Sequence, residues 1–160
     1  MKILVTTIPF VLMLVTGNAG ATRPFIDFRC LLNDADYVFI GSVDRISKDP
    51  IYADYMTDFY LSKIDILSSI KGQVSIRTID SKYIQLLWRH PDPEGPQLEL
   101  KRSYLFFIKN TTNGPVILNG SQGAREVSKD SVILVGRTFS IAKAREYLLS
   151  RAPISCPRQD

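Results

Sequence analysis

The stretch "CLLNDADYVFIGSV", residues 30–43, joins a cysteine and a short polar cluster to a run of strand-forming residues. From Tyr37 onward the side chains alternate between two faces, which is the periodicity of a β-strand. Gly41 interrupts this run, and a glycine inside a strand indicates a bulge or the sharp bend that a barrel requires. The stretch therefore predicts a bent first strand over residues 37–46.

Further along the chain, several segments have the same strand character. The run "SYLFFIK", residues 103–109, is the strongest of them because it is rich in aromatic residues. Lys71-Gly72 and Asn113-Gly114 are turn sequences, so each predicts a hairpin. Further strands are predicted over residues 57–67, 73–79, 83–88, 103–109 and 116–118, and residues 132–135 form either a strand or the lead-in to a helix.

The remaining segments are predicted to be loops, apart from one helix at the end of the chain. Residues 47–54, the proline-rich "RHPDPEGP" at 89–96, and residues 121–129 lack a strand pattern. Ser140 is a favourable N-cap, and the apolar stripe that follows it predicts a helix over residues 140–151. The stripe consists of Ile141, Ala144, Tyr147 and Leu148.

Short strands joined by turns, with one closing helix, are typical of a mainly β protein. The bent first strand and the two long connections favour a small Greek-key, OB-like β-barrel with a C-terminal α-helix. A chain of 160 residues is expected to form one domain. We therefore expect a single OB-like domain over residues 22–160.

The first 21 residues are typical of a secretory signal peptide. Lys2 is followed by an apolar stretch and then by Ala19-Gly20-Ala21, which fits the small-residue cleavage rule. The alternative is an uncleaved anchor, although the apolar stretch is shorter than the ~20 residues of a membrane span. The pattern predicts an exported protein, periplasmic or secreted, with no membrane span in the mature chain.

Export changes how the two cysteines, Cys30 and Cys156, are interpreted. In an oxidising compartment an even number of cysteines favours pairing, and two allow a single intramolecular disulfide. Two free buried thiols and an intermolecular bridge remain alternatives. We expect the disulfide, because it would tie the segment before the first strand to the segment after the final helix.

No motif in the sequence predicts catalysis, a metal site or a cofactor. His90 is the only histidine, so any nucleophile–histidine–acid triad would depend on it. One histidine and two cysteines are also too few to supply the four ligands of a structural zinc site. The position of His90 in a proline-rich loop indicates that it is a solvated surface residue. The net charge of +4 comes from scattered basic residues, which argues against nucleic acid as the partner.

The segment "YIQLLWRHPDPEGP", residues 83–96, holds the strongest candidate for a binding surface. Trp88, Arg89 and His90 lie together there, and tryptophan and arginine are enriched where proteins bind partners. A partner surface requires that Trp88 be solvent accessible. The alternative is that Trp88, with the two leucines before it, completes the core.

Three segments carry a resemblance to a known family: "ADYVFIGSV" (35–43), "FYLSKIDILSSIKG" (59–72) and "SYLFFIK" (103–109). Their order resembles that of bacterial members of the netrin-module and tissue-inhibitor-of-metalloproteinases superfamily, as does a C-terminal helix that ends in a cysteine. The resemblance spans residues 30–156 and implies an OB-type fold. The inhibitors chelate zinc through an N-terminal Cys-x-Cys, which this chain lacks, so that activity is not implied.

Taken together, these features predict an exported, monomeric and non-catalytic binding module whose partner is a protein or a glycan. The alternatives are a small envelope hydrolase that uses His90 and an exported OB-type binder of nucleic acid or oligosaccharide. Asn110 and Asn119 begin N-glycosylation patterns, which are chance matches if the protein is bacterial.

Overall fold

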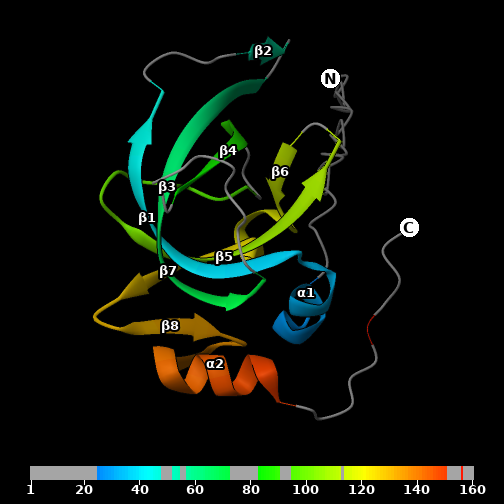
Figure 1. The fold of residues 1–160 in the computed structure, drawn as a ribbon, viewed down its shortest axis with the longest axis vertical. Coiled ribbons are helices and arrows are strands. Elements are labelled where there is room, and N and C mark those ends of the chain that lie inside the picture. Colours follow the sequence, from blue (N-terminus) through cyan, green and yellow to red (C-terminus); the bar gives the residue numbers. More distant parts are fainter. Residues whose placement is uncertain are drawn as a thin grey trace, which may run out of the picture.

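The computed structural model describes residues 25–47, 52–54, 57–72, 83–90, 95–112, 114–150 and 156. The expected signal peptide at 1–21 and the expected strand at 73–79 lie outside these residues. Within them the chain is mainly β, and a C-terminal helix follows the last strand (Figure 1). This confirms the predicted fold class at the level of its secondary structure.

Nine described strands form one antiparallel sheet. Their bounds are β1 Tyr37–Ile46, β2 Tyr52–Asp54, β3 Thr57–Lys71, β4 Tyr83–His90, β5 Ser103–Thr111, β6 Gly114–Ile117, β7 Ala124–Ser128, β8 Ser131–Leu134 and β9 Arg137–Ser140. The helices are α1 Phe28–Asp34 and α2 Ile141–Leu149, with a short 3₁₀ turn, η1, at Gly120–Gly123. Neither α1 nor α2 is long and apolar enough to cross a membrane.

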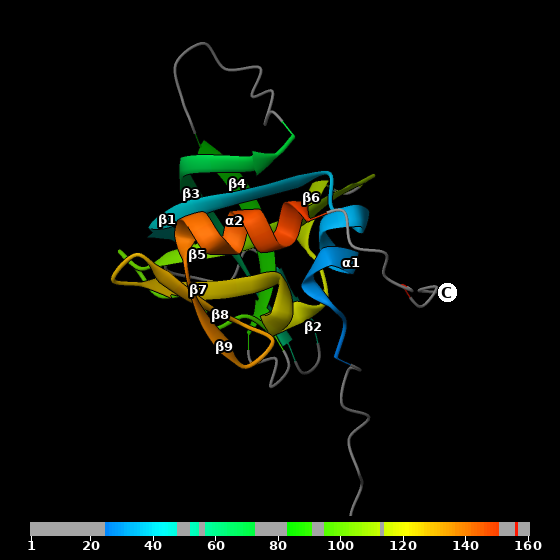
Figure 2. The ribbon, with the colours of Figure 1, turned by 90° about the horizontal axis from the view of Figure 1, so that it is seen from below.

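The sheet is curved but it does not close into a barrel. The strand order is β2-β3-β1-β5-β7-β8-β9, with β4 added beside β3 and β6 beside β5. β4 and β6 lie side by side (Figures 1 and 2), yet the described residues contain no hydrogen-bonded ladder between them. β6 has only four residues and contains Pro115, which lacks a backbone N–H, and such strands favour sheet edges. The expectation of a closed barrel is therefore wrong for the described strands.

β1 and β5 lie at the centre of the sheet, and both of their faces are buried. Phe39 and Phe106 point to one side, whereas Val38 and Phe107 point to the other, and all four are fully buried. A strand buried on both faces must be apolar at successive positions, which explains the runs "YVFI" and "LFFI". The predicted alternation of β1 is confirmed, because its two sets of side chains enter two different cores.

The two cores are separated by β1 and β5. The sheet-side core lies in the concavity of the sheet and consists of Phe39, Val43, Ile64, Ile84, Leu86, Trp88, Leu98, Tyr104, Phe106, Ile108 and Ala124. The helix-side core lies under α1 and α2 and consists of Ile26, Phe28, Cys30, Leu31, Leu32, Ala35, Val38, Ile40, Leu105, Phe107, Val132, Leu134, Ala144 and Leu148. The helices are thus required to cover an apolar sheet face that would otherwise meet water.

Gly41 bends β1 at the position that the sequence predicted. The pairing of β1 with β3 shifts register between Ile40 and Gly41, which is the expected irregularity. A Cβ at Gly41 would lie 2.6 Å from Ile64 Cγ2 and 3.0 Å from the Asp65 carbonyl oxygen. Glycine is therefore required here by the close approach of β3.

Helix α1 was not predicted, because seven residues are too few to show helical periodicity. Its N-cap is Asp27, whose carboxylate accepts a hydrogen bond from the Arg29 N–H at 2.8 Å. At the other end, the Lys71 ammonium donates to the carbonyl oxygens of Leu32, Asn33 and Ala35 at 2.7, 3.0 and 2.7 Å. The Lys71 charge thus satisfies the orphan carbonyls of α1 from the end of β3.

Helix α2 confirms the predicted C-terminal helix, and it ends two residues before the expected end at 151. Ser140 is its N-cap and accepts from the Lys143 N–H at 3.4 Å. Ala144 and Leu148 are buried in the helix-side core, and Ile141 and Tyr147 pack against it, as the stripe predicted.

All three segments predicted as loops contain strand residues, and in the segment 89–96 these are Arg89 and His90, which end β4. Residues 52–54 form β2, which extends the edge of β3, and residues 124–128 form β7, which pairs with β5. The hairpin partner β9 was also missed, whereas residues 132–135 largely form β8. These strands are short and partly polar, so their identity depends on the neighbour with which they pair and not on a pattern of their own.

Candidate functional site

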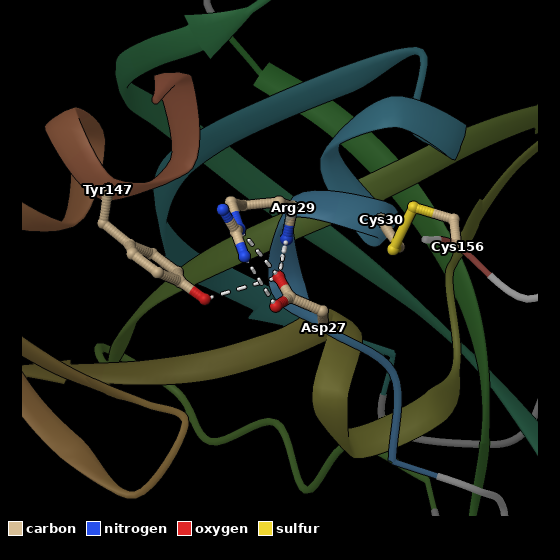
Figure 3. Close-up of a disulfide and its surroundings, with 5 residues drawn as sticks. All are labelled: Asp27, Arg29, Cys30, Tyr147 and Cys156. Atoms are coloured by element: carbon tan, nitrogen blue, oxygen red, sulfur yellow. Dashed lines mark hydrogen bonds and ion pairs between the residues drawn. A yellow bond between two sulfur atoms is a disulfide. The ribbon is translucent and has the colours of Figure 1, made fainter. Parts of the chain in front are cut away.

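The predicted disulfide between Cys30 and Cys156 is present (Figure 3). The two Cα atoms lie 5.5 Å apart, although the cysteines are separated by 126 positions in the sequence. Cys30 is on α1 and is 2% exposed, whereas Cys156 is exposed. The described residues contain no free cysteine, so no thiol nucleophile is available among them.

Beside the disulfide, Asp27 joins α1 to α2 (Figure 3). Its carboxylate accepts from Arg29 Nε and Nη2, each at 3.2 Å, and from the Tyr147 hydroxyl at 3.3 Å. The Arg29 guanidinium also lies over the Tyr147 ring, 5.4 Å from its centre. Every member of the group has a partner inside it, so the group stabilises the junction of the two helices and offers no free acid or base.

The pKa values of this group follow from these contacts. Burial opposes the charge of Asp27, but the hydrogen bonds and positive charge of Arg29 outweigh it, so the pKa of Asp27 is lowered. Burial and the negative charge of Asp27 together raise the pKa of Tyr147. The carboxylate is therefore held ionised and the phenol neutral, which is the opposite of a poised proton-transfer pair.

Trp88 lies in the sheet-side core and not on the surface. Its side chain is 8% exposed, and its Nε1–H donates to Ser62 Oγ at 2.7 Å. Its ring centre lies 5.8 Å from that of Tyr60. A partner surface that includes Trp88 required an accessible side chain, and the burial of Trp88 rules this out; the alternative, that Trp88 completes the core, is the one the structure shows. The residues before the prolines continue β4 into the concavity of the sheet, where a large ring fills space.

Arg89 and His90 end β4, where the backbone register pairs them with Phe59 and Asp58 of β3. They were expected to lie in a loop, but this part of the loop is strand. Their side chains lie outside the described residues, so a role for them in binding stays a prediction.

A cleft of about 460 Å³ opens between the N-terminus of α2 and the sheet. We name it the α2 cleft and define it by its lining residues: Ile40, Leu67, Ser68, Ser103, Val127, Asp130, Ser140, Ile141 and Ala142. Its volume is in the range of small-ligand pockets. Five of the nine lining residues are apolar and come from β1, β3, β7 and α2, and the polar ones are three serines and Asp130.

The wall and the rim of the α2 cleft come from two different elements. Leu67 on β3 is 62% exposed, which is high for a leucine. Asp130 lies in the β7–β8 turn, where Lys129 and Asp130 both have positive φ values, 48° and 58°. The Ile141 N–H donates to the Asp130 carbonyl oxygen at 3.0 Å, which fixes the turn against the first residue of α2. The cleft is therefore preformed by backbone contacts.

The α2 cleft was missed from the sequence, although Leu67 gave a signal. In β3, Ser62 and Ile64 are the buried set, whereas Lys63 and Asp65 point away from the core. Leu67 continues the Lys63 and Asp65 series, so it is an apolar residue on a polar face. Such a residue is either a binding contact or exposed by chance. The sequence cannot distinguish the two, because it does not show that α2 lies beside Leu67 and forms a cleft with it.

The described residues hold no group of three or more histidine, cysteine, aspartate or glutamate side chains that could bind a metal ion. Asp44, the acidic centre of the largest ion-pair group, accepts from Lys63 at 3.0 Å and from Lys101 at 3.2 Å. The pKa of Asp44 is lowered chiefly by the hydrogen bond from Lys63. These charges neutralise one another on the surface.

Comparison with known proteins adds no assignment. No protein-family model matches the chain, and the search of curated proteins found no match.

Proposed function

We propose that this chain is an exported, non-catalytic interaction module that binds a segment of a protein partner in the α2 cleft. The observation that carries the proposal is the cleft itself, which is preformed, mostly apolar and bordered by the exposed Leu67. The signal-peptide pattern of residues 1–21 supports export. The Cys30–Cys156 disulfide is compatible with an oxidising compartment.

An OB-related fold supports the same proposal. β1 lies between β3 and β5, β4 returns beside β3, and β6 approaches β4, and this strand order is compatible with an open relative of the OB fold. The resemblance to the netrin-module superfamily implies such a fold. Because one fold carries many functions, the proposed activity rests on the cleft and not on the resemblance.

The composition of the cleft defines the proposed occupant. Ile40, Val127 and Ile141 favour an aliphatic or aromatic side chain, because such a side chain would remove apolar surface from water. Asp130 lines the cleft, is exposed and forms no ion pair among the described residues, so it favours a basic residue next to the apolar one. The occupant is therefore a short apolar–basic peptide segment.

Selection from a random peptide library tests this proposal, followed by anisotropy measurements with the selected peptides. We expect enrichment of an aromatic or aliphatic residue next to lysine or arginine. Ala142→Arg, which fills the cleft from an exposed helical position, should abolish binding, and Leu67→Gln should weaken it about tenfold. Asp130→Asn keeps the positive-φ preference of the turn and should lose the selection for the basic residue.

Leu100→Gln is the matched control, because Leu100 is also an exposed leucine, 55%, but does not line the cleft. It should bind the peptides as the parent chain does. The proposal fails if no sequence is enriched, or if the selected peptides bind Ala142→Arg and the parent chain equally.

A further inference from the structure

The tip of the β8–β9 hairpin has a backbone that its sequence does not favour. Leu134 pairs with Arg137, so Val135 and Gly136 alone form the turn, with φ values of 51° and 69°. Two positive φ values define a type I′ turn, for which asparagine followed by glycine is preferred. Gly136 fits this turn, whereas Val135 does not, because a β-branched residue is strained at positive φ.

The strained residue is also exposed. Val135 is 44% exposed, and Ile133, two residues before it on the same hairpin, is 51% exposed. Neither side chain belongs to either core. Strain that is not explained by packing indicates a functional role for the side chain that bears it. The tip therefore presents two aliphatic side chains to the surroundings at a cost in backbone energy.

Two arginines flank this tip. Arg137 follows the turn directly and is exposed, and the Arg125 Nε–H donates to the Ile133 carbonyl oxygen at 3.3 Å. Neither guanidinium forms an ion pair with a carboxylate among the described residues. Glu126, the neighbouring acidic residue on β7, is already paired with Arg102 at 2.8 Å. The tip is thus aliphatic at its end and positively charged at its base.

We propose that the β8–β9 tip, defined by Ile133, Val135, Arg125 and Arg137, docks onto the surface of an anionic lipid bilayer. Ile133 and Val135 enter the boundary between headgroups and acyl chains, and the arginines bind lipid phosphates, which is the distribution of apolar and basic groups found in membrane-surface segments. A protein partner fits less well, because a stable protein interface buries ~800 Å² on each side, and a two-residue turn offers a small protrusion.

This docking is independent of the proposed peptide binding, because none of these four residues lines the α2 cleft. Docking would hold the chain at a membrane surface and leave the α2 cleft accessible to a peptide. Failure of one proposal therefore leaves the other standing.

Sedimentation of the full mature chain with vesicles tests the inference. We expect binding to vesicles of phosphatidylcholine mixed with phosphatidylglycerol, weaker binding as salt is raised, and little binding to phosphatidylcholine alone. Arg137→Gln should weaken binding roughly fivefold, since a basic residue near an anionic surface contributes about that factor. Ile133→Thr, which keeps strand propensity on an exposed face, should also weaken it severalfold.

The most informative variant is Val135→Asn, because it should raise the stability of the protein and at the same time lower its binding to vesicles. Asparagine suits the first position of a type I′ turn, so the melting temperature should rise. Vesicle binding should fall by at least fivefold, because the aliphatic tip is removed. A variant that is more stable yet binds less cannot be explained by a loss of folding.

Lys129→Asn provides the matched control. Lys129 occupies the first position of the β7–β8 turn with a φ of 48°, so asparagine relieves similar strain there without changing the β8–β9 tip. It should keep most of the vesicle binding. The inference is overturned if the parent chain does not bind the anionic vesicles, if Val135→Asn binds them as the parent does, or if Lys129→Asn loses as much binding as Val135→Asn.

Discussion

At the scale of single residues, Trp88 shows how a residue type can suggest a function that its surroundings exclude. Tryptophan is common both in binding surfaces and in cores, and the sequence left both interpretations open. The structure places the ring in the sheet-side core with its N–H bonded to Ser62. Its role is therefore to fill the concavity of the sheet.

Because Trp88 is the only tryptophan, its fluorescence tests this placement directly. We expect blue-shifted emission in the native protein and little quenching by iodide, because water and ions cannot reach a side chain that is 8% exposed. Unfolding in guanidinium should shift the emission to the red and restore quenching. Equal quenching of the native and the unfolded protein would place Trp88 at the surface.

Asp27 has two roles, as N-cap of α1 and as the charged centre of its junction with α2. The pKa of Asp27 is lowered on folding, so its ionised form stabilises the protein above the unfolded-state pKa of ~3.9. That contribution is lost as the pH falls through this value toward the folded-state pKa. Asp27→Asn keeps a good capping residue but removes the charge, so it should lower stability at pH 7 more than at pH 3.

The measurement is urea unfolding of both proteins across this pH range. Asp27→Ala, which removes the cap as well, should cost ~1 kcal/mol more than Asp27→Asn at both pH values. If the difference between the parent chain and Asp27→Asn does not change with pH, the charge of Asp27 makes no contribution.

At the scale of elements, β1 depends on one glycine to remain in the sheet. The contacts that a Cβ would make at Gly41 involve Ile64, which is fully buried, and the backbone of β3. Neither neighbour can move without disturbing the sheet-side core. The bulge therefore allows β1 to bend while it pairs with both β3 and β5.

Gly41→Ala should consequently destabilise the protein by ~1–3 kcal/mol, the usual cost of overpacking a core. Ser42→Ala is the control on the same strand, and it should change the free energy of unfolding by less than ~0.5 kcal/mol. Denaturant unfolding followed by far-UV circular dichroism measures both. A Gly41→Ala protein as stable as the parent would show that β3 does not approach β1 so closely.

At the scale of the whole molecule, the Cys30–Cys156 disulfide connects the two ends of the fold. Cys30 belongs to α1 and the helix-side core, so the bridge attaches residue 156 to α1. In the chain-entropy account, a loop of this length gives ~5 kcal/mol of stability, and the values measured for native disulfides are ~2–5 kcal/mol. The bridge is therefore a major contribution to a stability of ~5–15 kcal/mol.

Cys156→Ser is the suitable variant, because it leaves the buried Cys30 side chain in place. We expect it to lose ~2–4 kcal/mol of stability in urea unfolding. Thiol titration of the exported parent protein in denaturant, without reductant, should find no free thiol. Two titratable thiols under those conditions would contradict the disulfide.

The proposed export predicts a defined N-terminus. If residues 1–21 are a cleaved signal peptide, the mature chain begins at Thr22, because Ala19 and Ala21 satisfy the cleavage rule. The intact mass of protein recovered from outside the cytoplasm tests this. A mass that retains residues 1–21 would favour the uncleaved anchor.

The sequence by itself determined the features that arise from local periodicity and covalent chemistry. β1, β5, α2 with its Ser140 cap and the bend at Gly41 were predictable, because each depends on a run of neighbouring residues. The Cys30–Cys156 disulfide was expected because two cysteines in an exported chain allow one intramolecular pairing, although free thiols and an intermolecular bridge stayed alternatives until the structure placed the two residues together.

Only the tertiary structure decided the features that depend on which distant segments meet. None of β4's full length, β7, β9 and α1 has a strong pattern of its own. β4 depends on β3, β7 on β5, β9 on β8, and α1 on Lys71. The α2 cleft likewise joins Leu67 and Asp130 across the fold. A binding surface is a property of several elements in space, and so the sequence, which orders residues along one line, could not show it.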